Sequence, residues 1–218
     1  MIRLENLTKT FTREGYSKTV ADRISVTFPT GVSVGLFGRN GAGKSTLLKM
    51  IAGTLKPTSG RVVTDGTISW PVGFAGSFHG DLTGAQNTRF IARIYGVDTD
   101  ALVDFVEDFA ELDHHFHLPL STYSSGMRSR LAFGVSMGMR FDTYLVDEVT
   151  SVGDAAFRKK SDAVFLSRMR ASGAVVVSHS METMRLLCTM GAVLENGELR
   201  VFDNIEHAIR HHLVNMQV

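Results

Sequence analysis

The chain has 218 residues, of which 44% are hydrophobic and 21% charged, the balance of an ordinary globular protein large enough to bury a full core. Its 23 basic and 22 acidic side chains nearly cancel and never gather into a long run of one charge, which argues against a nucleic-acid partner. The single cysteine, Cys188, excludes an internal disulfide, and no apolar run is long enough to form a membrane-spanning helix.

The first part of the chain predicts two kinds of strand. Residues 2–7 and 24–28 alternate apolar and polar side chains, as half-exposed strands of an antiparallel sheet do. Residues 32–37 are mostly apolar and predict a buried strand, which a glycine-rich loop joins to a helix. Two further short strands are expected around residues 61–64 and 67–70.

The middle of the chain changes to a helical period. Apolar side chains recur at helical spacing between about residues 83 and 140, and a third helix is expected to begin near Ser125. We interpret the apolar stripes as core-forming and the whole stretch as a helical subdomain inserted into the sheet. The first two stripes are Phe90, Ile91, Ile94 and Tyr95, and then Leu102, Val103, Phe105, Val106 and Phe109.

The last part returns to strands. Residues 143–146 and 174–177 are short and continuously apolar, which predicts parallel strands buried on both faces. Residues 191–201 predict a hairpin, and a short amphipathic helix follows it. The pattern as a whole predicts an α/β protein with one domain over residues 1–218 and a helical subdomain at about 83–140.

One loop carries the pattern G-x-x-x-x-G-K-[ST], which binds nucleotide phosphates when it leaves a strand and opens a helix. Its glycines let successive backbone N–H groups converge on a phosphate, and the helix start adds a partial positive charge. We expect Lys44 to reach the β- and γ-phosphates of ATP, Ser45 to bind Mg²⁺ and Thr46 to contact the α-phosphate. The predicted nucleotide-binding residues of the loop are Gly38, Arg39, Asn40, Gly41, Ala42, Gly43, Lys44, Ser45 and Thr46.

Two carboxylates end the apolar strand near residue 146. Asp147 and Glu148 lie where open α/β sheets bind their ligands, at the carboxyl end of a buried strand. We expect Asp147 to support the Mg²⁺ ion and Glu148 to orient and deprotonate the attacking water.

A third segment resembles the signature motif of ABC proteins, L-S-G-G-Q. Ser124 and Gly126 match the motif directly, whereas Tyr123, Ser125 and Met127 depart from it. The resemblance extends over nearly the whole chain. It implies a P-loop NTPase fold with an ABC-type RecA-like core, an antiparallel β subdomain and an inserted helical subdomain.

The same resemblance gives roles to two later segments. Residues 151–154 lie where ABC proteins have their D-loop, and Asp154 is expected to act on the opposite nucleotide site. His179 follows a strand at the place of the family's switch histidine and is expected to contact the γ-phosphate. With Lys44 and Glu148 it completes the predicted catalytic set.

Two features of the family are matched less well. The family usually has a glutamine before its helical subdomain, but residues 72–79 contain none, and Ala75 lies nearest its place. The family also stacks an aromatic side chain on the adenine. Tyr16 is the first candidate for this role and Phe11 the second, although either can equally anchor a loop.

The resemblance also implies an assembly. Two copies would pack head to tail, so that each ATP lies between the Lys44 loop of one copy and Ser124, Ser125 and Gly126 of the other. Residues 147–160 are similar to those of bacterial ABC exporters of polysaccharide. Some O-antigen exporters append a carbohydrate-binding domain to the ATPase core, whereas this sequence stops soon after it, so the resemblance is greatest to the exporters of capsular polysaccharide. This similarity implies integral membrane permease subunits as partners, polysaccharide as cargo, and a peripheral position on the cytoplasmic face of the inner membrane.

Two alternatives stay open from the sequence. Another envelope cargo, such as O-antigen, teichoic acid or lipid, would use the same ATPase residues. A soluble ABC ATPase acting on DNA or ribosomes would be expected to carry a long coiled-coil insertion or a second ATPase domain, and this sequence has neither.

Overall fold

The computed structural model describes residues 1–73, 76, 78–148 and 153–216, and the chain divides into two compact units. Unit 1 contains Met1–Pro71, Phe141–Glu148 and Met169–Val218, and unit 2 contains Val72–Arg140 and Val149–Arg168. The predicted helical subdomain, at about residues 83–140, falls within unit 2. Within the described ranges, none of the helices is long and apolar enough to cross a membrane.

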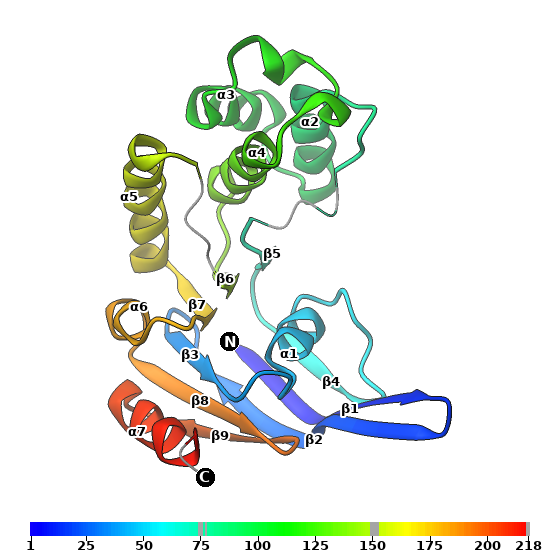
Figure 1. Ribbon diagram of the computed structural model, residues 1–218, viewed down its shortest axis with the longest axis vertical. Helices are drawn as coiled ribbons and strands as arrows, with labels where there is room; N and C mark the ends of the chain where they lie inside the picture. The colour runs from blue at the N-terminus through cyan, green and yellow to red at the C-terminus, as the bar shows by residue number, and fades with distance from the viewer. Residues whose placement is uncertain (74–75, 77, 149–152, 217–218) are drawn as a thin grey trace. The chain divides into compact units, whose positions relative to one another are not determined.

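Unit 1 is built on a six-stranded sheet (Figure 1). All neighbouring strands are parallel except the last pair, which forms the predicted antiparallel hairpin. The central strands are short and mostly apolar because both faces of the sheet are covered. In sheet order the strands are β5 (Ile68–Pro71), β6 (Thr143–Asp147), β7 (Gly173–Val177), β3 (Ser33–Phe37), β8 (Met190–Glu195) and β9 (Glu198–Phe202).

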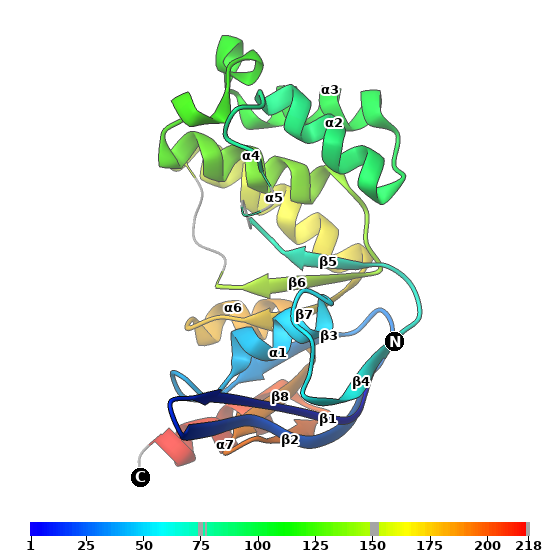
Figure 2. The same cartoon turned by 90° about the vertical axis from the view of Figure 1, so that its right-hand side faces the viewer.

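A second, antiparallel sheet of unit 1 is longer than the sequence predicts. It has the order β2 (Tyr16–Phe28), β1 (Ile2–Arg13) and β4 (Ser59–Thr64), and β1 and β2 form the long hairpin seen in Figure 2. The expected strands covered only its inner part, around residues 2–7 and 24–28. Side chains in the outer part of the hairpin are largely exposed, so no apolar alternation marked it as strand.

The core of unit 1 lies between the two sheets and contains α1 (Lys44–Ile51). Alternate residues of β3 face opposite sides: Val34 and Leu36 join this core, whereas Gly35 faces α7 (Ile205–Met216) and α6 (Met181–Leu187). A Cβ at Gly35 would come within 2.9 Å of Ile205 Cδ1, so the missing side chain allows the helices to approach the sheet closely.

Unit 2 is helical. Its elements are α2 (Gly84–Tyr95), α3 (Thr99–Ala110), two short 3₁₀ helices (Asp113–His117 and Leu120–Thr122), α4 (Ser125–Gly138) and α5 (Ala155–Ala171), whose last residues belong to unit 1. A capping box starts α2, because Thr83 and Gln86 each bond the other's backbone N–H. The rings of Phe109, Phe133 and Phe157, which pack stacked and edge-on, form part of the core of unit 2. The α/β class predicted from the sequence is confirmed.

One predicted core stripe is wrong. Of the four residues in the stripe predicted on α2, only Ile91 is buried, at 4% exposure, whereas Phe90, Ile94 and Tyr95 are 51%, 62% and 45% exposed. Consecutive positions on a helix differ by about 100°, so Phe90 cannot share the buried face with Ile91. The inward positions next to Ile91 are instead filled by Asn87, Thr88 and Ala92.

Candidate functional site

The phosphate-binding loop joins β3 to α1 in unit 1. Gly38 and Gly43 have φ angles of 149° and 112°, which L side chains rarely adopt. A Cβ at Gly43 would also lie 2.9 Å from the Val20 Cβ. No side chain caps the start of α1 among the described residues, so the N–H groups of its first turn are available to bind an anion.

The Lys44 ammonium is held by the loop itself. It donates hydrogen bonds to the carbonyl oxygens of Gly38, at 2.8 Å, and Arg39, at 3.2 Å. Partial burial lowers the pKa of Lys44, and the charges of Glu148 and Asp147 oppose that shift. The loop therefore places a cation close to the predicted catalytic carboxylate, Glu148, and to the predicted Mg²⁺ ligand, Asp147.

Both carboxylates lie at the end of β6, beside the end of its parallel neighbour β7. Asp147 is the last residue of β6 and pairs with Val177, the last residue of β7. Glu148 has a φ of 51°, and its backbone N–H donates to the Val177 carbonyl oxygen at 2.9 Å. Its carboxylate is 3.0 Å from His179 Nε2. Unit 1 thus brings together Lys44, Asp147, Glu148 and His179 as the sequence predicted.

The donor atoms near this point suit a magnesium ion. Ser45 offers a hydroxyl at the start of α1, and Asp147 offers a carboxylate at the end of β6. Both are oxygen donors, the kind of ligand that Mg²⁺ prefers, and Mg²⁺ commonly takes only one or two protein ligands beside phosphate oxygens and water. The residues present therefore fit the ion.

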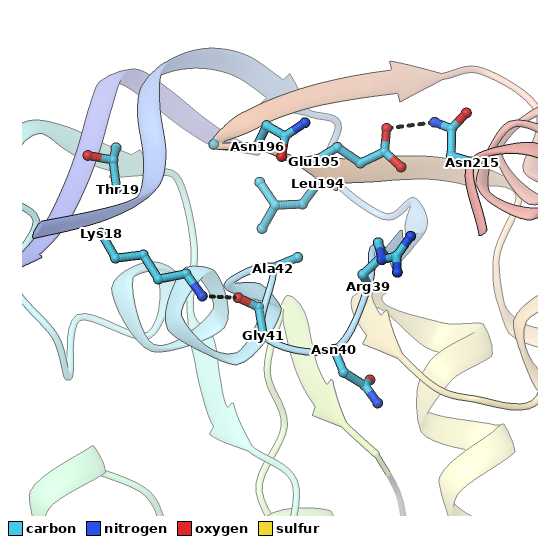
Figure 3. A pocket seen from close by; sticks show the side chains of 11 residues that line it. Lys18, Thr19, Arg39, Asn40, Gly41, Ala42, Leu194, Glu195, Asn196 and Asn215 are labelled. Carbon is cyan, nitrogen blue, oxygen red and sulfur yellow. Dashed lines mark hydrogen bonds between the residues drawn. The ribbon is translucent and has the colours of Figure 1, made fainter. Parts of the chain in front are cut away.

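A cavity of about 670 Å³ adjoins the phosphate loop in unit 1 (Figure 3). Lys18 points from β2 toward the loop, where its Nζ donates to the Gly41 carbonyl oxygen at 3.1 Å. On the opposite wall, Asn215 of α7 donates to a Glu195 carboxylate oxygen at 2.6 Å. The lining residues are Lys18, Thr19, Arg39, Asn40, Gly41, Ala42, Leu194, Glu195, Asn196, Gly197 and Asn215. Sequence reasoning missed Lys18 and Asn215 because no local motif contains them.

The two candidate adenine platforms differ in their distance along the β1–β2 hairpin. Phe11 pairs directly with Lys18, the residue that reaches the phosphate loop, whereas Tyr16 pairs with Arg13 nearer the hairpin turn. Side chains of directly paired residues lie on the same face of a sheet. The register therefore places Phe11 nearer to the loop than Tyr16, the first candidate from the sequence.

In unit 2, the loop with the signature-like residues begins α4. The Ser124 hydroxyl caps the helix by accepting the Met127 N–H at 3.2 Å, and Ser124, Ser125 and Gly126 are all exposed. Tyr123, which departs from the L-S-G-G-Q pattern, is buried and donates to the His115 carbonyl oxygen at 2.6 Å. Burial raises the pKa of Tyr123 to about 12, so it remains a neutral donor that anchors this loop.

Asp154 of unit 2 caps α5. One carboxylate oxygen accepts the backbone N–H groups of Ala156 and Phe157, each at 3.0 Å, and the other accepts from Arg130 at 2.7 Å. The Phe157 N–H and then the Arg130 charge lower the pKa of Asp154. These are contacts within its own chain, which the sequence did not predict.

The sequence matches the model of a known family. Residues 21–151 match the model of the ABC transporter family. The chain belongs to the ABC transporter family. The remaining family positions, Ser151 and Val152 of the predicted D-loop and Ala75 in place of the usual glutamine, lie outside the described residues.

ABC relatives match over almost the full length of the chain. The "Polysialic acid transport ATP-binding protein KpsT" of Escherichia coli is 46% identical over 96% of this chain and 95% of its own. The "ATP-binding protein BexA" of Haemophilus influenzae is 41% identical over 97% of this chain and 98% of its own.

A solved ABC structure has the same fold. The dimeric ATP-binding cassette MJ0796, in a post-hydrolysis state bound to ADP and Pi, superposes with a TM-score of 0.75. It is 22% identical and covers 93% of this chain and 98% of its own. The ABC-type fold predicted from the sequence is confirmed.

Proposed function

We propose that this ABC protein is the ATP-hydrolysing subunit of an exporter of capsular polysaccharide. The observation that supports hydrolysis most directly is the convergence of Lys44, Asp147, Glu148 and His179 beside the start of α1. The cargo is inferred from relatives named for polysialic acid transport and capsule polysaccharide export, which are 46% and 42% identical. Relatives named for O-antigen and teichoic acid export are 34–39% identical over 81–90% of the chain.

The loop and the first turn of α1 bind the phosphates. Backbone N–H groups contact the β-phosphate, and the Lys44 ammonium exchanges its carbonyl partners for β- and γ-phosphate oxygens. Thr46 contacts the α-phosphate. Ser45 and Asp147 would hold Mg²⁺, which when bound would neutralise charge on the phosphate oxygens.

Hydrolysis uses the two groups at the strand ends. The Glu148 carboxylate orients a water molecule and accepts its proton as the water oxygen bonds to the γ-phosphorus. The bond from that phosphorus to the β–γ bridging oxygen breaks, and ADP leaves. His179, already 3.0 Å from Glu148, holds the carboxylate in line and contacts the γ-phosphate.

A second copy of the chain completes the site. The exposed residues Ser124, Ser125 and Gly126 open α4, whose N-terminus suits an anion. A head-to-tail homodimer places them against the γ-phosphate held by the partner copy, and Asp154 lies near the start of α5 in the same unit. Moving an open–closed equilibrium from 1:99 to 99:1 requires about 5.5 kcal/mol, which two such phosphate sites can supply.

The partners in the membrane are permease subunits. The exposed apolar residues Phe90, Ile94 and Tyr95 of α2 support such a contact, because large exposed apolar groups commonly mark interaction sites. Arg89 and Arg93 are exposed on the same helix and favour an acidic partner segment. The assembly places the chain at the cytoplasmic face of the inner membrane, where it drives polysaccharide through the permease.

The decisive variant is Glu148→Gln. It keeps the side-chain shape but removes the proton acceptor, so ATP hydrolysis should fall about 100-fold while ATP binding persists and a dimer accumulates. Turnover is measured as phosphate release, and the dimer by size-exclusion chromatography with light scattering.

Glu107→Gln is the matched control for this test. It also breaks a Glu–His pair, since Glu107 is 2.9 Å from His117 Nε2, but Glu107 is on α3 of unit 2 and is not one of the proposed site residues. Its turnover should equal that of the wild type. A Glu148→Gln chain that hydrolyses ATP at the wild-type rate would exclude Glu148 as the base.

A further inference from the structure

Arg130 connects two helices of unit 2 through three contacts. It lies on α4, soon after the signature residues that open that helix, and its side chain is only 19% exposed. Its Nη2 donates to the Asp154 carboxylate at 2.7 Å, and its guanidinium carbon is 4.4 Å from the centre of the Phe157 ring. A second carboxylate, that of Glu111, lies 3.9 Å from Nη1.

The partners of Arg130 are themselves fixed in position. Asp154 accepts two backbone N–H groups at the start of α5, so its carboxylate cannot move independently of that helix. Phe157 is 1% exposed and packs edge-on against Phe109, which stacks on Phe133 of α4. The start of α5 and the body of α4 are therefore one packed block.

The ion pair contributes little to stability by itself. The Asp154 side chain is 65% exposed, and pairs with one partner in solvent are largely screened. The aromatic contacts between α3, α4 and α5 hold the unit together without it. An arginine that satisfies a carboxylate and stacks on a ring at the same time fixes an angle between two helices more than it adds to the free energy of unfolding.

We infer that Arg130 is a positioning residue for ATP hydrolysis, which links the helix that begins with Ser124, Ser125 and Gly126 to the helix that begins after Asp154. Asp154 follows the catalytic Glu148 in the chain after the short segment 149–153. Through Arg130, the helix that begins with the signature residues offered to the partner copy is tied to the start of α5, the next described helix after Glu148 in the chain. This inference rests on the proposed function.

The test compares four variants of the full-length chain: Arg130→Met, Arg130→Lys, Asp154→Asn and the double variant Arg130→Met with Asp154→Asn. Arg130→Met should lower kcat for ATP about tenfold and leave KM within about twofold, because phosphate binding by unit 1 does not use this pair. Lysine keeps the charge but cannot also stack, so Arg130→Lys should retain an intermediate kcat. The double variant should be no slower than the slower single variant, as expected for residues that act through one contact.

Arg158→Met is the matched control. It removes an exposed arginine that lies one helical turn after Asp154, on α5. The kcat and KM of this variant should equal those of the wild type. Thermal unfolding of every variant checks the fold. If Arg130→Met has no cooperative unfolding transition, the kcat of Arg130→Lys is compared with that of the control instead.

Three results overturn the inference: an Arg130→Met kcat equal to that of the control, a rise in KM in place of the fall in kcat, or losses that multiply in the double variant. A wild-type chain without ATPase activity would instead overturn the proposed function, and this inference with it.

Discussion

The predicted nucleotide-binding groups of unit 1 and unit 2 are prepared in different ways. In unit 1 they already contact one another: Lys44 bonds the carbonyl oxygens of its own loop, and Glu148 lies 3.0 Å from His179. In unit 2 the start of α4 is exposed, and its best-defined contact is the Ser124 cap on the Met127 N–H. Unit 1 therefore holds the groups proposed to bind and hydrolyse ATP, whereas unit 2 offers the start of a helix.

This difference has a structural origin. The groups of unit 1 project from the carboxyl ends of neighbouring parallel strands, which the sheet holds at fixed spacing. The groups of unit 2 are hydroxyls and backbone N–H donors at a helix start, which is a site only when an anion reaches it. Substitutions in the site of unit 1 should therefore abolish ATP binding or the hydrolytic step at the nucleotide bound by that same chain. Substitutions at the start of α4 should abolish only the closure of the dimer, which needs two chains.

The largest expected effect combines one variant from each unit. Lys44→Met removes the cation from the phosphate loop, and Gly126→Asp puts a carboxylate where the partner's γ-phosphate would bind. Each should lower turnover at least about 100-fold. Mixed in equal amounts, they should recover about a quarter of wild-type turnover, because half of the dimers are mixed and each of these has one complete site. Phosphate release from the separate and mixed proteins measures the effect.

Gly126→Asp is not expected to disturb the fold. A Cβ at Gly126 meets only the Ser124 hydroxyl, at 3.9 Å, and an aspartate suits a helix start. Gly80→Asp is the control, since a Cβ at Gly80 meets nothing within 4 Å and the residue is not in the proposed site. If the mixture stays as inactive as its components, the two units do not complete each other's site.

The residues that unit 1 brings together could be named from the sequence because their signals are local. Asp147 ends an apolar strand, Glu148 and His179 each follow one within two residues, and Lys44 ends the glycine-rich loop after another. Parallel strands bring such ends together. The contact between Arg130 and Asp154 has no such signal, since it joins residues on two helices whose packing no periodicity gives. The exposed stripe on α2 was misjudged because apolar character alone does not say which face of a helix is covered.

The next effect distinguishes two aromatic residues of unit 1. Phe11→Ala should raise the KM for ATP about tenfold with little change in kcat, because stacking on a base contributes roughly 1–3 kcal/mol. Tyr16→Ala, which removes a ring farther along the hairpin, should change KM less than about twofold. Steady-state kinetics on both variants measures this. A larger KM change for Tyr16→Ala would identify Tyr16, the first candidate from the sequence, as the ring that stacks on adenine, and would contradict the assignment of Phe11 from strand register.

The smallest effect concerns the support under the phosphate loop. His212 of α7 is 8% exposed, lies 5.5 Å ring to ring from Phe37, and its Nδ1 has no hydrogen-bond partner in the described part of the chain. Burial lowers the pKa of His212; Glu195 raises it, and Lys44 and His211 lower it further. The unfolded chain therefore takes up this proton first, so stability falls as pH drops below the usual histidine pKa of about 6.5.

His212→Phe should remove that pH dependence. Relative to the wild type, its unfolding midpoint should rise by roughly 2 °C more at pH 5.5 than at pH 8. His207→Phe, on an exposed position of the same helix, should keep the wild-type pH slope. Calorimetry at the two pH values measures both, and an unchanged slope for His212→Phe would show that another group titrates.

The two hydrogen bonds from Lys44 to backbone carbonyl oxygens determine which ligands the loop can bind. A ligand gains this cation only by offering oxygens that outcompete the Gly38 and Arg39 carbonyls, at 2.8 and 3.2 Å. A multiply charged phosphate chain can do so, whereas chloride or a lone carboxylate from the cell's abundant small anions gains too little from the exchange. The hydrogen bonds within the loop therefore select ligands by their charge, before any contact with the nucleobase is made.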